Sequence, residues 1–130
     1  MNIYYEAWQI QCCGKPFKIG DRVRWSCVLP KEEKYACGHK IDFYEEHHGD
    51  ETHSIVGTIS GILAEIEFPM VKGQDHSNAQ KYTMPLLEAD GYETDEFCRK
   101  EGNRYFWGYI VTMKDVEIGD YDKNLTYDYN

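Results

Sequence analysis

Two pairs of adjacent residues in this sequence are of the types that bind metals. Cys12 and Cys13 lie in the stretch WQIQCCGKPF, and His47 and His48 lie further along the chain in EEHHGD. Thiolates and imidazoles are the usual ligands of zinc, but these pairs lack the C-x₂₋₄-C and H-x₃₋₅-H spacing of common zinc sites. The four residues are candidate metal ligands. The spacing nevertheless favours a chain without a cofactor, and zinc is the alternative.

In the metal-free alternative the cysteines serve packing. Free cysteine is among the most buried residue types. Gly14 and Pro16 follow the pair and predict a turn, where both side chains can tilt to the same face. We therefore expect at least one of Cys12 and Cys13 to be buried as a small hydrophobe that shapes the turn, with Trp8 packed nearby.

A nucleophilic cysteine needs a lowered pKa and a nearby histidine that acts as a base. His47 or His48, flanked by Glu45, Glu46 and Asp50, supplies a base and an orienting carboxylate. No helix N-terminus is predicted beside the cysteines to stabilise a thiolate. The sequence also lacks the phosphate-loop, dinucleotide-binding, zinc-protease and serine-hydrolase motifs. A small thiol or metal-dependent enzyme centred on the CCG and HH motifs is therefore the alternative function.

The favoured function is a small, non-enzymatic binding or adaptor module. Aromatic side chains contact protein and peptide partners through grooves and open sheet edges. The candidate contact residues are Trp8, Gln9 and Trp107. No complete catalytic set can be assembled from the sequence, so we expect a protein or peptide partner.

Charge and cysteine content restrict the other partners and the compartment. The formal net charge is −9, which opposes binding to nucleic-acid phosphates despite the basic residues Lys15, Lys18, Arg22 and Arg24. No apolar run reaches the length of a membrane span, and the N-terminus does not resemble a signal peptide. The five cysteines do not form an even framework, which indicates reduced thiols. We expect a cytoplasmic protein without nucleic-acid or membrane partners.

Three segments show the patterns of strands. Residues 21–28 alternate apolar and polar side chains, so Val23, Trp25 and Cys27 should point inward. Residues 55–68 predict a long bent strand, with Gly57 and Gly61 where a bulge or a close approach is needed. Residues 105–113 are bulky on both faces, as in a covered central strand. The predicted buried residues are Val23, Trp25, Ile62, Ile66 and Val111.

Two segments indicate short helices. Residues 93–102 place acids before bases and end in glycine, which is typical of a helix. The segment HKIDFYEEHHGD favours a helix that ends at Gly49, although Ile41, Phe43, Glu45 and His47 would also share one face of a strand.

These elements predict an all-β or β-rich α+β fold, a small bent sheet of the SH3-like barrel type with one or two short helices. One domain is expected over residues 1–114. Residues 72–80 are polar, and the acidic tail over residues 115–130 is expected to be partly mobile.

The N-terminal third resembles a known family. The residues WQIQCCGKPFKIGDRVRW, followed by the acid-His-His-Gly motif at Glu46, His47, His48 and Gly49, resemble a family of short bacterial proteins of unknown function. Its signature is similar to WQxxCCGxPFxxGDxVxW. The resemblance implies a bacterial, cytoplasmic protein without an assigned activity.

Overall fold

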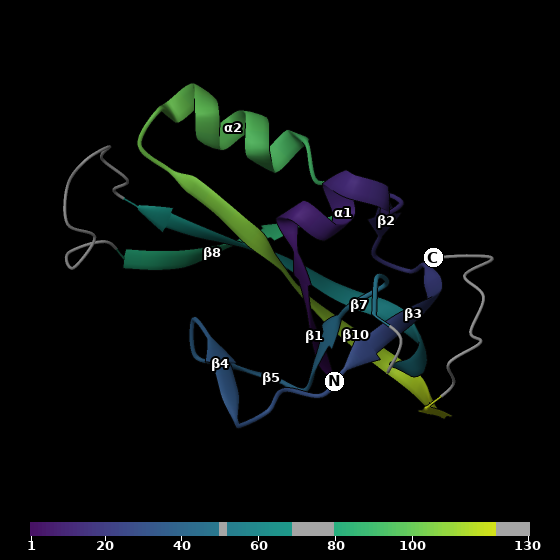
Figure 1. Ribbon diagram of the computed structural model, residues 1–130. Coiled ribbons are helices and arrows are strands. Elements are labelled where there is room, and N and C mark those ends of the chain that lie inside the picture. The colour runs from purple at the N-terminus through teal and green to yellow at the C-terminus, as the bar shows by residue number, and fades with distance from the viewer. Residues whose placement is uncertain (50–51, 69–79, 122–130) are drawn as a thin grey trace.

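The computed structural model describes residues 1–49, 52–68 and 80–121 (Figure 1). Ten strands and two short helices follow one another along these ranges. In chain order they are β1 Asn2–Glu6, α1 Ala7–Cys13, β2 Phe17–Lys18, β3 Arg22–Val28, β4 Lys34–Ala36, β5 His39–Ile41, β6 Phe43–Glu45, β7 His53–Phe68, β8 Gln80–Leu86, β9 Glu88–Ala89, α2 Glu93–Glu101 and β10 Tyr105–Tyr121. No helix within these ranges is both long and apolar enough to cross a membrane.

The main sheet is mixed and has six strands in the order β10-β1-β6-β3-β7-β8. β1 runs parallel to β6, and the other pairings in this sheet are antiparallel. β10 also pairs with β7, so the path β10-β1-β6-β3-β7 returns to its first strand. The β-rich fold class is confirmed, and the SH3-like barrel type stays a prediction.

The two longest strands bend where their register shifts. β7 and β10 change register between the pairs formed by Phe106 and Gly108, and again between those formed by Thr112 and Met113. Gly108 lies where β10 crosses β1, and a Cβ there would stand 2.5 Å from the backbone oxygen of Tyr5. A Cβ at Gly57 would stand 2.9 Å from the sulfur of Met113. The expected close approach at Gly57 is thus confirmed.

The core lies on the inner face of the bent sheet. The five residues predicted to be buried, Val23, Trp25, Ile62, Ile66 and Val111, all belong to one buried cluster, as does Cys27. The three predicted strands are confirmed, although β7 and β10 are longer than expected. β10 continues to Tyr121 and so crosses the predicted domain boundary at residue 114. Most of the polar 72–80 segment, and residues 122–130, lie outside the described residues.

The helix predicted over residues 39–49 is wrong. This segment forms β5 and β6, with Ile41, Phe43 and Glu45 buried as in the strand alternative. A tight hairpin precedes it, in which Cys37 and Gly38 both have positive φ, +48° and +82°. The predicted helix near residues 93–102 is confirmed as α2, which ends at Gly102 with φ +80°.

The turn predicted at the two cysteines is also incorrect, because they end a helix. α1 has seven residues, no side-chain cap at its N-terminus and no acidic residue in its first turn. Such a short helix depends on tertiary packing, which Gln9 and Ile10 provide by being buried. Gly14 and Pro16 end the helix, and the amide of Gly14 donates a 3.1 Å hydrogen bond to the carbonyl of Ile10.

Candidate metal centre

The C-terminal turn of α1 presents two thiols to solvent. Cys12 and Cys13 are both exposed, so the expectation that one of them is buried is wrong. Residues four positions apart lie on one face of a helix, which places Trp8 above Cys12 and Gln9 above Cys13. Gln9 and Ile10 are buried and anchor the helix, whereas Trp8, Cys12 and Cys13 are exposed, so the thiols lie at the exposed C-terminal end of α1.

The two histidines follow β6 directly. Glu45 ends this strand with its side chain inside, and the amide of Glu46 donates a 2.8 Å hydrogen bond to the carbonyl of Ser26. The carboxylate of Glu46 accepts a 3.0 Å hydrogen bond from the backbone amide of His48. This short turn holds the imidazoles of His47 and His48 side by side, with ring centroids 4.2 Å apart.

The thiols and imidazoles come from segments far apart in the sequence and meet at one point. The sulfur of Cys13 lies 2.9 Å from Nε2 of His47 and 3.1 Å from Nε2 of His48. The sulfur of Cys12 lies 3.9 Å from Nε2 of His48. The ligand atoms of Cys12, Cys13 and His48 all lie within 4.8 Å of one another, so this cluster could hold a metal ion.

The hydrogen bonds on the far side of each ring define which nitrogen carries the proton. Nδ1 of His47 lies 2.5 Å from one carboxylate oxygen of Glu45 and 3.0 Å from the other. Nδ1 of His48 lies 2.8 Å from Oε1 of Gln9. The Gln9 oxygen and an ionised Glu45 carboxylate are both acceptors, and with these partners each neutral ring donates from Nδ1 and presents a lone pair at Nε2. Burial raises the pKa of Glu45 to about 8, and a cation bound at Nε2 of His47 would favour the ionised carboxylate. With a cation present, two lone pairs therefore point to the place where the sulfur of Cys13 lies.

The titration of these groups argues against a nucleophilic role for Cys13 in the metal-free protein. Burial, followed by the neighbouring His48, lowers the pKa of His47 and keeps its imidazole neutral, the form that binds metals. Desolvation and the adjacent thiol of Cys12 raise the pKa of Cys13. A nucleophilic cysteine needs the opposite shift. Without a cation beside it, Cys13 is therefore held as a thiol.

The spacing of the donor atoms is compatible with zinc. Zinc bonds of about 2.3 Å to sulfur and about 2.0 Å to nitrogen, at tetrahedral angles, place sulfur and nitrogen about 3.5 Å apart. The three sulfur–nitrogen distances of 2.9, 3.1 and 3.9 Å bracket this value. Cys12, Cys13 and His48 form the group whose donors all lie within 4.8 Å of one another, and His47 lies beside it with Nε2 2.9 Å from the sulfur of Cys13.

The residues expected to contact a partner lie in different environments. Trp8 is 52% exposed and stacks on the ring of His48, with centroids 5.5 Å apart. Trp107 is 39% exposed and packs edge-on against Tyr105. Gln9 is fully buried, so it has no surface to offer a partner and instead accepts the hydrogen bond from His48. Asp50, considered as an orienting acid, lies outside the described residues.

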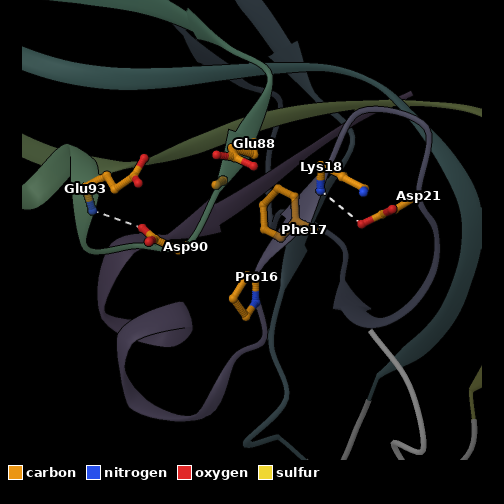
Figure 2. A pocket seen from close by; sticks show the side chains of 8 residues that line it. Pro16, Phe17, Lys18, Asp21, Glu88, Asp90 and Glu93 are labelled. Carbon is orange, nitrogen blue, oxygen red and sulfur yellow. Dashed lines mark hydrogen bonds between the residues drawn. The ribbon is translucent and has the colours of Figure 1, made fainter.

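A pocket of about 360 Å³ is lined in part by the segment that follows α1 (Figure 2). Its lining residues are Pro16, Phe17, Lys18, Asp21, Glu88, Ala89, Asp90 and Glu93. Two of its carboxylates serve the local backbone, since Asp21 accepts from the amide of Lys18 at 3.0 Å and Asp90 from that of Glu93 at 2.9 Å. None of the candidate ligands lines this pocket, so it is separate from the metal centre.

The whole candidate centre lies in the part of the chain that a protein-family model matches. A model described as a family of unknown function matches residues 1–115. The chain belongs to family DUF6578. The DUF6578 region includes the four candidate ligands together with Gln9 and Glu45, and it confirms the expected assignment to a family of unknown function. Neither a curated protein nor a solved structure matches the chain. The consensus signature and the bacterial source stay predictions.

Proposed function

We propose that this protein is a zinc-binding protein in which Cys12, Cys13, His47 and His48 form a four-coordinate Cys₂His₂ site. The observation that carries the proposal is the convergence of two imidazole lone pairs on one thiol, at 2.9 and 3.1 Å. A single S–H proton satisfies one lone pair, whereas a divalent cation accepts from all of the donors at once. Loss of the thiol protons leaves two negative charges, which balance the charge of Zn²⁺.

The proposed role of the ion is structural. Four protein ligands fill a tetrahedral zinc and leave no position for a substrate. The ion would join the end of α1 to the turn after β6, and α1 is too short to be stable by itself. Metal binding in such sites adds directly to the free energy of folding. The zinc would therefore fix α1 on the sheet.

The test is the metal content of the purified protein, measured by native and denaturing mass spectrometry. We expect one zinc per chain in the native protein, and its loss in Cys13→Ser and in His48→Ala. Cys37→Ser is a matched control, because Cys37 is also an exposed cysteine but has its sulfur 3.5 Å from Glu65. Native protein without a stoichiometric metal after zinc loading, or equal loss in the control, would contradict the proposal.

We propose a protein- or peptide-binding role as the second candidate function. The observation that favours it is a surface group in which Trp107 packs on Tyr105 at 4.6 Å and the Lys81 ammonium lies 4.8 Å from the Trp107 ring centre. Exposed aromatic residues are enriched at protein interfaces. Screening on a peptide array should identify sequences whose binding is lost in Trp107→Ala and kept in Cys37→Ser.

A further inference from the structure

Two buried polar side chains stand directly behind the candidate ligands. Glu45 is 2% exposed and Gln9 is completely buried. Burying a carboxylate or an amide costs free energy unless hydrogen bonds compensate. Glu45 contacts Nδ1 of His47, and Gln9 contacts Nδ1 of His48. Each imidazole is therefore held from inside the fold by one acceptor, with Nε2 turned outward towards the thiols.

The orientation of the Gln9 amide places its NH₂ group in an unfavourable environment. Its oxygen faces His48, while its Nε2 is buried and has no hydrogen-bond partner among the residues that the structure describes. A buried donor left without an acceptor costs free energy. An amide turned the other way would donate to Nδ1 and move the ring proton to Nε2, which would block metal ligation. The present orientation leaves Nε2 of His48 free to bind a cation.

We infer that Glu45 and Gln9 are positioning residues that set the zinc affinity of this site, Glu45 with the negative charge that a bound cation favours and Gln9 with a neutral dipole. The inference rests on the proposed zinc site. A carboxylate behind a histidine ligand raises the basicity of the ring and fixes its orientation, and loss of such a partner costs roughly 10–100-fold in metal affinity. A neutral amide fixes the orientation without contributing a full charge. The two imidazoles thus differ in the charge of the side chain that holds them.

This difference in charge predicts opposite effects on zinc affinity for two substitutions, one from an acid to an amide and one from an amide to an acid. Glu45→Gln keeps an acceptor but removes the charge behind His47, so zinc affinity should fall by roughly 10-fold or more. Gln9→Glu places a carboxylate behind His48 and removes the unpartnered donor, so zinc affinity should rise. The same carboxylate should lower the stability of the metal-free protein, because a buried charge is best compensated when the cation is present.

The experiment is a zinc titration of the full chain against a chromophoric chelator of known affinity, repeated with Co²⁺ to record the absorption bands of the bound ion. Glu65→Gln is the matched control. Glu65 is also a buried acid, 4% exposed, but its carboxylate accepts a 2.6 Å hydrogen bond from the hydroxyl of Tyr4 and not from a candidate ligand. The control should keep the wild-type affinity. Glu45→Gln and Gln9→Glu should shift it in opposite directions and move the Co²⁺ bands.

The outcomes separate this inference from the proposed function. Wild-type protein that binds neither zinc nor Co²⁺ overturns the proposed zinc site itself. Wild-type protein that binds zinc, with affinity and Co²⁺ spectrum unchanged in both variants, overturns the positioning roles alone. Where a charge variant does not fold, Gln9→Met is used, because it conserves volume and removes the acceptor. It should lower the affinity, and unchanged affinity would again overturn the role of Gln9.

Discussion

Replacing Cys13 with serine measures how much the metal centre adds to the stability of the fold. Both imidazoles face this sulfur, at 2.9 and 3.1 Å, so the variant loses the donor on which the site converges. A ligand that binds only the folded state adds about 2.7 kcal/mol when its free concentration is 100 times its Kd. For 130 residues the entropy of unfolding is about 0.27 kcal/mol per kelvin, which converts this gain to about 10 °C in Tm.

The assay is thermal unfolding followed by circular dichroism at a series of buffered free-zinc concentrations. We expect the Tm of the wild-type protein to rise with the logarithm of free zinc, and the Tm of Cys13→Ser to stay constant. Cys37→Ser should behave as the wild type. A wild-type Tm that does not respond to zinc, or a Cys13→Ser variant that responds equally, would refute the reasoning.

Three further predictions concern the fold and the remaining thiols. Gly108→Ala should destabilise the protein by about 1–3 kcal/mol in urea unfolding, because its Cβ would meet a β1 carbonyl oxygen at 2.5 Å. Gly61→Ala, whose nearest neighbour is 3.6 Å away, should have a much smaller effect. Burial raises the pKa of Cys98 to about 11, so alkylation at pH 8 should be far slower there than at the exposed Cys37, and equal rates would contradict this. Tyr109→Phe should cost about 1–3 kcal/mol, since its buried hydroxyl accepts from a backbone amide that precedes α2, and an unchanged urea midpoint would count against this.

The part of the fold that could be predicted from the sequence was the set of strands with a clear local periodicity. Alternation in residues 21–28 indicates a strand that is buried on one face. Bulky residues on both faces of residues 105–113 indicate a strand that is buried on both faces. The glycines of β7 likewise indicated its bending. The acids, bases and terminal glycine of residues 93–102 are local signals too, and they predicted α2 correctly.

The elements around the metal centre depend on contacts that no local pattern records. β6 is a strand because it lies between β1 and β3, which supply its hydrogen bonds. The residues Glu45, Glu46 and His47 are equally compatible with the end of a helix. α1 is held by its buried side chains, and its following Gly14 and Pro16 indicate a turn equally well. The ligand types were visible in the sequence. The geometry of their convergence was not, because the parallel pairing of β1 with β6 creates it.

The position of β1 has a consequence for the order in which the protein is made. β1 lies between β6 and β10, and the side chains of Asn2 and Thr112, which share a hydrogen bond, are 110 residues apart in the sequence. A ribosome adds roughly 5–20 residues per second, so all four thiols and imidazoles are synthesised seconds before the strand that completes the sheet around β1. We therefore expect metal capture and closure of the sheet to be steps of one folding reaction, in which zinc supplied during refolding changes the rate as well as the yield.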